Sequence, residues 1–309
     1  MTKATVILLA VIIDLLEGDP PNRFHPVVGM GNWFKLGRSL APTRHRFGFG
    51  AGWVLAGLAL IIAPVGLIKR TRPALKPAAP FLLKPMFAYR DLRRAVAEVG
   101  RAVAADDLPE ARRLLSWHLV SRDTTTLTRP EIIAAAIASL VENLTDSLTA
   151  PLLAYAAGGL PAAWAYRLVN TADAMWGYRT AELEQLGKFP ARLDDLLNWL
   201  PARLSGWLLV LAAQLAGADA KNARLTMLAH HQRTPSPNAG WTMSAIAGAC
   251  HITLAKQDIY RLPGGDRPIT LATLNQAIRL ADIAAGLTIG LTCAVAIIDQ
   301  VIKRKSRDD

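Results

Sequence analysis

Cysteine is scarce in this chain, and the familiar nucleotide-binding motifs are missing. Cys250 and Cys293 are the only cysteines in 309 residues, and both lie in apolar runs far apart in the sequence. This favours small core residues over a disulfide or a pair of metal ligands. The chain also lacks G-x-x-x-x-G-K-[ST], G-x-G-x-x-G and H-E-x-x-H, so a bound nucleotide must be held in another way.

Patterns typical of β-strands are nearly absent too, as are internal repeats and low-complexity tracts. Alanine and leucine dominate the chain, and apolar residues recur at helical spacing. The sequence therefore predicts an all-α fold. We expect residues 1–309 to form a single domain, with residues 88–120 as a helical insertion within it.

Acidic residues are outnumbered by basic ones. The chain has 24 Asp and Glu against 35 Lys and Arg, which gives a net charge of +11. The basic residues are spread out and form no recognition motif, so we expect no nucleic-acid partner. Positive loops on the cytoplasmic side of a membrane explain the imbalance better. Lys303, Arg304, Lys305 and Arg307 close the chain and predict a cytoplasmic C-terminus.

Long apolar runs, by contrast, are present. Residues 49–68 contain no charge over twenty positions, which is the length of one membrane span. Residues 204–218 and 283–298 are shorter uncharged runs, and we predict spans there as well. Residues 4–13 are also apolar, but Asp14 and Glu17 follow and no cleavage site is present. We expect a retained helix there, and an integral membrane protein with several spans.

Residues 88–120 show a different pattern. Val96, Val99 and Val103 recur at helical spacing, while Arg94 and Arg101 fall on other faces. A second helix is predicted to begin near residues 106–110. Together these segments predict an amphipathic helical hairpin at the membrane surface. The prolines before it predict a linker rather than a regular helix; they are Pro73, Pro77, Pro80 and Pro85.

Residues 147–166 are uncharged but interrupted. Pro151, the pair Gly158-Gly159 and Pro161 predict a broken helix, which is tolerated at membrane depth where it is buried in protein or lines a cavity. The break follows directly after Glu142 and Asp146. Ionisable groups at this depth are costly and usually functional, so we place the candidate site here.

The carboxylates around this break suit a magnesium ion. Glu142 and Asp146 are spaced i and i+4, so both project from one helix face, and Asn170 and Asp173 follow on the next helix. Mg²⁺ is typically held by one or two carboxylates plus substrate phosphates. Helix capping is the competing interpretation for any single residue of this set.

Further along, arginines and carboxylates alternate. Arg192 with Asp194 and Asp195 suits either ion pairs or a phosphate site, and Arg203 suits either snorkelling or a phosphate clamp. Three shorter motifs are ambiguous on their own. They are His25-Pro26-Val27, Ser121-Arg122-Asp123 and Ser236-Pro237-Asn238-Ala239-Gly240.

Taken together, these motifs resemble the CobD/CbiB family, the adenosylcobinamide-phosphate synthases of cobalamin biosynthesis, and they run over nearly the whole chain. The matching elements are Gly18-Asp19-Pro20 with His25-Pro26-Val27, Ser121-Arg122-Asp123, Glu142-Asn143-x-x-Asp146, Gly158-Gly159-x-Pro161, Asn170-Thr171-x-Asp173-x-Met175-x-Gly177-Tyr178, Ala191-Arg192-x-Asp194-Asp195-x-x-Asn198-x-x-Pro201-Ala202-Arg203 and Ser236-Pro237-Asn238-Ala239-Gly240-Trp241. The chain departs from the family pattern at Ala138, Ser147 and Thr234, which affects the membership of the metal shell.

The resemblance implies a multi-pass enzyme of the bacterial inner (cytoplasmic) membrane. Such an enzyme joins (R)-1-aminopropan-2-yl phosphate, or a related aminoalcohol, to the free propionate of adenosylcobyric acid. The product is adenosylcobinamide phosphate, with ATP as co-substrate and Mg²⁺ as cofactor. The expected partners are the corrinoid, the aminopropanol phosphate and the lipid bilayer. Assembly as a homo-oligomer, or with other cobalamin-pathway membrane enzymes, stays open.

The resemblance and the residue chemistry together assign roles. Glu142, Asp146 and Asp173 are the expected magnesium ligands. Asp194 or Asp195 would accept a proton from the amine, with His25 as a further candidate base. The expected substrate-binding and phosphate-binding residues are Arg122, Asp123, Asn143, Asn170, Arg192, Asn198, Arg203, Ser236 and Asn238.

Two other interpretations fit parts of the pattern. A magnesium-dependent membrane prenyltransferase would carry D-x-x-x-D repeats on both helices, but the second helix offers only Asp173. A non-enzymatic membrane sensor or transporter, as in the distantly similar AmpE proteins, has no need for so many arginines and carboxylates in register.

Overall fold

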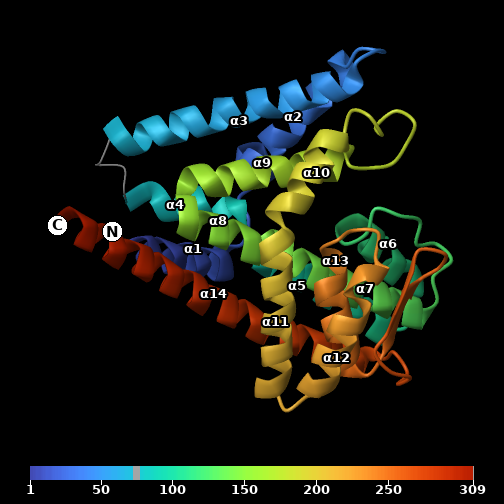
Figure 1. Ribbon diagram of the computed structural model, residues 1–309. Helices are drawn as coiled ribbons and strands as arrows, with labels where there is room; N and C mark the ends of the chain where they lie inside the picture. The colour runs from blue at the N-terminus through green and yellow to red at the C-terminus, as the bar shows by residue number, and fades with distance from the viewer. Residues whose placement is uncertain (72–76, 309) are drawn as a thin grey trace. The chain divides into compact units, whose positions relative to one another are not determined.

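The computed structural model describes residues 1–71 and 77–308, and the chain folds as two compact units. Unit 1 comprises Met1–Ala88, Ala150–Asn198 and Ile289–Asp309, and unit 2 comprises Tyr89–Thr149 and Trp199–Thr288. The predicted all-α class is confirmed, because helices account for nearly every element (Figure 1). The one sheet among the described residues is a two-stranded hairpin.

Unit 1 contains the N-terminal helices and the Asn170–Asp173 and Asp194–Asn198 motifs. Its helices are α1 (Lys3–Glu17), α2 (Pro26–Leu40), α3 (Arg46–Thr71), α4 (Ala79–Leu83), α8 (Ala150–Gly158), α9 (Leu160–Trp176), α10 (Lys188–Leu197) and the end of α14 (Leu271–Asp308). Short 3₁₀ turns lie at Asn22–Phe24 and Lys84–Met86. Pro77 lies before the short α4, Pro80 lies in its first turn, and Pro85 lies in the 3₁₀ turn that follows it, while Pro73 lies outside the described residues.

The ends of α1 and α2 bring the Gly18-Asp19-Pro20 and His25-Pro26 motifs together. Gly18 ends α1 with a φ of 74°, and its N–H donates to the Asp14 carbonyl at 3.0 Å. His25 begins α2, because its Nδ1 accepts from the Val27 N–H at 3.2 Å and Pro26 follows at the first helical position.

The predicted helix break is confirmed at the glycine pair. Gly159 has a φ of 74° and separates α8 from α9, and Pro161 lies in the first turn of α9. Pro151 acts differently, because it follows a π turn at Thr145–Thr149 and the helical path continues past it. A π turn is a common response to a proline that removes a helical hydrogen bond.

Helices α9 and α10 pack against each other within unit 1. Gly187 lies just before α10 and touches the backbone of Trp176, where any Cβ would overlap the Trp176 carbonyl. This close approach returns the chain to α9 after the 177–187 loop. It brings the Asn170–Asp173 motif beside the Asp194–Asn198 motif.

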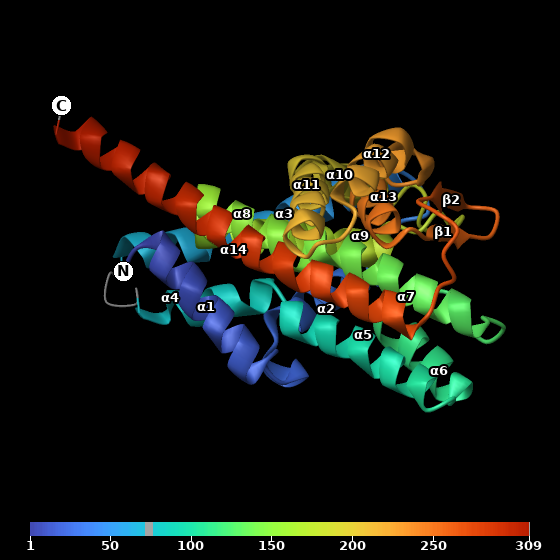
Figure 2. The same ribbon diagram turned by 90° about the horizontal axis from the view of Figure 1, so that it is seen from below.

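Unit 2 is built around the buried helix α7. Its elements are α5 (Tyr89–Ala104), α6 (Leu108–His118), α7 (Arg129–Leu144), the π turn at Thr145–Thr149, α11 (Trp199–Leu215), α12 (Ala220–His230), a 3₁₀ turn at His231–Arg233, α13 (Ala239–Cys250), β1 (Thr253–Lys256), β2 (Tyr260–Pro263) and the first part of α14. Helices α11, α12 and α13 lie side by side in Figures 1 and 2. Ile132, Ile133, Ile137 and Leu140 of α7 are fully buried.

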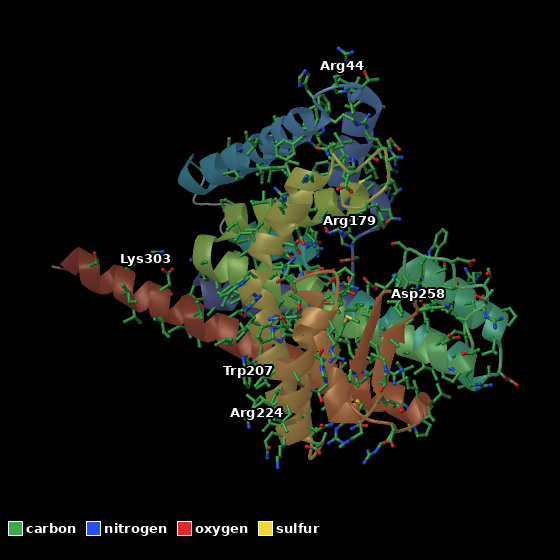
Figure 3. All side chains as sticks on the ribbon, turned by 45° about the vertical axis from the view of Figure 1, so that its right-hand side comes forward. Arg44, Arg179, Trp207, Arg224, Asp258 and Lys303 are labelled. Atoms are coloured by element: carbon green, nitrogen blue, oxygen red, sulfur yellow. The ribbon has the colours of Figure 1, made fainter. Side chains whose placement is uncertain are left out.

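The predicted helical hairpin at residues 88–120 is confirmed as α5 and α6, which lie side by side (Figure 2). Val96, Val99 and Val103 are buried while Arg94 and Arg101 are exposed, as the spacing predicts. Its position at a membrane surface stays a prediction. The β1–β2 hairpin was not expected from the sequence, and Figure 3 marks Asp258 in its turn.

Within residues 1–71 and 77–308, three helical segments are long and apolar enough to cross a membrane, and the total is four if a bent pair is counted as one span. The segments Arg46–Pro64 and Leu271–Lys303 contain most of the predicted runs at 49–68 and 283–298. Helix α11, 17 residues long, qualifies only together with α10, across a bend of 46°. The segment Arg129–Gly158 was not predicted as a span. These helices indicate a membrane protein.

Candidate functional site

The first candidate site lies in unit 1, where two amides hold the Asp194 carboxylate. Asn198 donates from Nδ2 to Asp194 Oδ2 at 2.9 Å, and Asn170 donates from Nδ2 to Oδ1 at 3.3 Å. The Tyr166 hydroxyl donates to Asn198 Oδ1 at 2.9 Å, which fixes the orientation of that amide. Three predicted residues, Asn170, Asp194 and Asn198, are therefore brought together.

Arg167 extends this network and was not predicted. Its Nη1 donates to Asn170 Oδ1 at 3.2 Å, and its Nε donates to the Met86 carbonyl at 2.9 Å. The signal was available in the sequence, because Arg167 and Asn170 are spaced i and i+3 and so share a helix face. Arg167 orients Asn170, so that its Nδ2 points to Asp194.

Asp173 lies one turn after Asn170 on α9 and is half-buried. Burial, and then the nearby carboxylates of Asp194 and Asp195, raise the pKa of Asp173 to about 7. A carboxylate with this pKa can accept a proton near neutral pH, which suits a general base. Arg192, also predicted here, is exposed, and its side chain makes no hydrogen bond or ion pair with any described residue.

His25 belongs to a separate cluster in unit 1, around the buried side chain of Lys84. Lys84 pairs with Asp14 at 2.9 Å and with Asp19, and it is only 3% exposed. His25 Nε2 lies 3.6 Å from Asp19 Oδ1, while its Nδ1 is used to cap α2. Burial alone would raise the pKa of Asp19. Hydrogen bonds from His25 and Lys84 outweigh burial and hold this pKa below its usual value.

A pocket of about 540 Å³ opens beside this cluster. Asp19 and Lys84 contribute its polar lining together with Glu17, and Phe24, Phe81 and Trp164 supply apolar walls. His25 itself is not among the lining residues. Its two ring nitrogens face the α2 backbone and Asp19, which gives it a structural contact at each end.

Three of the predicted residues of unit 2 lie on α7 and on the π turn that follows it. Between residues 132 and 149, Glu142 is the one exposed side chain, and Asp146 is half-buried in the π turn. Asn143 donates from Nδ2 to the Ser139 carbonyl at 2.9 Å and to Ser139 Oγ at 3.2 Å, so it is tied to its own helix. The Glu142 side chain is accessible to a ligand, although surrounding residues desolvate its carboxylate.

Arg122 and Asp123 lie in the loop between α6 and α7. Asp123 accepts from the Thr125 N–H at 2.9 Å and from Thr125 Oγ1 at 2.8 Å. These hydrogen bonds hold the pKa of Asp123 below its usual value. Asp123 therefore shapes the turn that presents Arg122.

Arg203 and the Ser236–Asn238 loop also meet within unit 2. The Arg203 guanidinium lies over the rings of Trp199 and Trp241, at 4.2 and 4.9 Å from their centroids. Its Nη1 lies 3.4 Å from Asn238 Oδ1. Ser236 Oγ accepts from the Asn238 and Ala239 N–H groups at 3.2 and 3.4 Å, so these amides are already used within the turn.

The predicted magnesium ligands are distributed over the two units, with Glu142 and Asp146 in unit 2 and Asp173 in unit 1. Among the described residues, no group of three or more His, Cys, Asp or Glu side chains is arranged to hold a metal ion. The exposed Glu142 and the half-buried Asp146, one helical turn apart, instead fit an ion that takes most of its ligands from phosphates and water. The shared three-carboxylate site stays a prediction.

Comparisons with known proteins agree with these motifs. The model of the family described as CobD/Cbib protein matches residues 7–289. A probable cobalamin biosynthesis protein CobD from Methanothermobacter thermautotrophicus is 43% identical over 270 residues, covering 85% of this chain and 87% of the relative. The cobalamin biosynthesis protein CobD of Dehalococcoides mccartyi is 36% identical over 298 residues, covering 94% and 96%.

A third relative, from Geobacter metallireducens, carries the same name and is 35% identical over 324 residues, covering 98% of each chain. No solved structure matches this chain. The family model covers most of the sequence, and each of these relatives aligns over most of both chains. The chain therefore belongs to the CobD/CbiB family of cobalamin biosynthesis proteins.

Proposed function

We propose that this protein forms an amide between a free propionate of (adenosyl)cobyric acid and the amine of (R)-1-aminopropan-2-yl phosphate or a related aminoalcohol, with consumption of ATP. Family membership supports the place in cobalamin biosynthesis. The observation that favours amide formation is the carboxylate of Asp173, whose pKa is raised to about 7 by burial, Asp194 and Asp195. Such a group matches the need of the reaction for a proton acceptor near neutral pH.

Amide formation from a carboxylate requires activation, because carboxylate oxygen is a poor leaving group. In the proposed reaction, a propionate oxygen attacks the terminal phosphorus of ATP, which gives an acyl phosphate and ADP. The amine nitrogen then attacks the acyl carbon, and inorganic phosphate leaves. The amine is an ammonium ion in water, so it must lose a proton before it can act as a nucleophile.

The unit 1 network supplies this step. Asp173 accepts the ammonium proton, and Asp194 and Asp195 provide the negative potential that makes this acceptance favourable near pH 7. The amides of Asn170 and Asn198 fix the Asp194 carboxylate, so this potential is held in one position. Asp173 in this role replaces Asp194 and Asp195 as the first candidate base.

Mg²⁺ would enter with ATP, and Glu142 and Asp146 are the residues that would hold it. When bound, the ion would neutralise negative charge on the phosphates. Arg203 and Arg192 are candidates for contact with phosphate groups of either substrate. Arg203 is the better placed of the two, because Trp199, Trp241 and Asn238 already hold its guanidinium.

A lysate experiment tests this function. A host that lacks its own copy of the gene is transformed with this chain, and its lysate is supplied with adenosylcobyric acid, ATP and single candidate amines. We expect adenosylcobinamide phosphate, identified by mass spectrometry, to form with aminopropanol phosphate. If the protein is present in the membrane fraction but none of the amines is consumed, the proposal is refuted.

A further inference from the structure

The β1–β2 hairpin presents a lysine and a tyrosine towards the interior of unit 2. Lys256 pairs with Tyr260 across the strands, and Leu254 pairs with Leu262. Residues two apart on a strand share a face, so Lys256 and Tyr260 lie on the same face as these two leucines. Leu254 and Leu262 are 1% and 0% exposed. The hairpin therefore turns Lys256 and Tyr260 inward, and β1 packs against α7.

Two other groups act on this inward-facing pair. They are Arg122, from the loop before α7, and Glu142, the exposed carboxylate of α7. Burial and then Arg122 lower the pKa of Lys256, and Glu142 opposes them. Burial and then Glu142 raise the pKa of Tyr260 to about 12, and Arg122 opposes them. The hairpin packs through β1 on α7, which carries Glu142, and Arg122 lies in the loop that leads into α7, so these side chains come from segments that meet around α7.

The charged side chains of this cluster do not pair with one another. In the part of the chain that the structure describes, Arg122, Glu142, Lys256 and Tyr260 form no ion pair within 4.0 Å and no side-chain hydrogen bond. Elsewhere in unit 2, charged side chains do pair, as Arg93 does with Asp282 at 2.8 Å. Two cations and a carboxylate held apart in this way are suited to ionic groups that arrive with a ligand.

We propose that Arg122, Lys256 and Tyr260 bind the phosphate chain of a nucleoside triphosphate whose divalent cation lies at Glu142 and Asp146. This inference rests on the proposed ATP-dependent function and gives it a binding site. The two cations neutralise phosphate oxygens, and the tyrosine hydroxyl donates to one of them. A carboxylate beside a phosphate is repelled unless a cation lies between them, which explains Glu142 at the edge of a basic cluster.

Binding of a non-hydrolysable ATP analogue tests the site without reference to turnover. The purified full-length protein in detergent is titrated with the analogue by calorimetry, with and without Mg²⁺. We expect Lys256→Gln to weaken binding by about tenfold or more, which corresponds to roughly 1.4 kcal/mol. Lys256→Arg should retain most of the affinity. Tyr260→Phe should cost a few-fold, and Glu142→Gln should remove the strengthening of binding by Mg²⁺.

Arg261→Gln is the matched control. Arg261 pairs with Ala255 on the opposite face of the same hairpin and is exposed, so this variant removes the same charge from the same element. Its affinity should stay within about twofold of wild type, by the small effect expected of a distant surface charge. Equal weakening by Lys256→Gln and Arg261→Gln would overturn the proposal, as would a site that binds aminopropanol phosphate in preference to the nucleotide analogue.

The nucleotide site and the proposed amide-forming function can be refuted separately. If the analogue binds as predicted but no amide product forms with any amine, the site stands and the proposed function fails. If Lys256→Gln binds the analogue and forms product like wild type, the proposed function stands and the site is refuted.

Discussion

The backbone of Gly177 lies directly against the carboxylate of Asp173. A Cβ at position 177 would come within 2.9 Å of Asp173 Cγ and would overlap Oδ1. The Gly177 N–H also donates to the Asp173 carbonyl at 2.6 Å, where α9 ends. Glycine at this position therefore sets where the Asp173 carboxylate can lie.

Gly177→Ala should displace the Asp173 carboxylate and lower kcat by about tenfold or more, because misplacement of a reacting group by ~1 Å is costly. Gly52→Ala in α3 is the control, since its added Cβ would meet nothing within 4 Å. Steady-state kinetics and thermal unfolding should be measured on the same preparations. Wild-type kcat in Gly177→Ala would show that the position of Asp173 does not matter for turnover.

The raised pKa of Asp173 predicts a pH dependence of stability. The pKa is 3.8 without the fold and about 7 within it, so the native state binds more protons between these values. The free energy of unfolding should therefore fall as pH rises from about 4 to about 7, and this contribution should then level off. Asp173→Asn should remove it, as measured by the difference between wild-type and variant melting temperatures across this range.

The same residue predicts the pH dependence of activity. A base works only when it is deprotonated, so kcat should rise with pH through about 7 and Asp173→Asn should lose most activity. If Asp173 instead holds a cation, the ion would favour the charged carboxylate. The pH at which kcat rises would then become lower as the Mg²⁺ concentration is increased. That result would contradict the proposed role of Asp173 as base.

Lys84 should be a major determinant of the stability of unit 1. It is 3% exposed and pairs with Asp14, whose side chain is 2% exposed, so Lys84→Met leaves a buried carboxylate without its cation. We expect a loss of about 3–5 kcal/mol. Lys3→Met is the matched control, because Lys3 pairs with Asp299 where both side chains are 23–29% exposed, and it should cost under about 1 kcal/mol. Chemical denaturation in detergent measures both.

The C-terminus should lie in the cytoplasm. The span Leu271–Lys303 is followed by a cluster of basic residues, and such clusters stay on the cytoplasmic side. A fluorescent protein fused after the last residue should be bright, and alkaline phosphatase fused there should be inactive. Active phosphatase at this position would reverse the orientation.

Periodicity in the sequence predicts those elements whose signal is local. The valines of α5, the uncharged run in α3 and the break at Gly159 all depend on residues near one another in the chain. The span Arg129–Gly158 was missed because Glu142, Asp146 and Pro151 interrupt its apolar pattern. The π turn at Thr145–Thr149 accommodates the proline, and a π turn leaves no simple spacing in the sequence.

Contacts between distant segments account for what was missed in the candidate site. Asn170, Asp194 and Asn198 could be nominated by residue type, but the contact of Tyr166 with Asn198 depends on how α9 packs on α10. Lys256 and Tyr260 lie in a short hairpin whose turn, Gln257-Asp258-Ile259, lacks the usual Asn-Gly or Asp-Gly signal. Their placement near Glu142 depends on the packing of β1 against α7.

Product formation by the purified protein is the decisive test of ATP-dependent amide formation. Protein in detergent is supplied with Mg²⁺, ATP, adenosylcobyric acid and (R)-1-aminopropan-2-yl phosphate, and product and ADP are quantified over time. We expect adenosylcobinamide phosphate and ADP in equal amounts, with no product when ATP or Mg²⁺ is omitted. Product formation at an unchanged rate without ATP, or ADP release with no amide, would refute ATP-dependent amide formation.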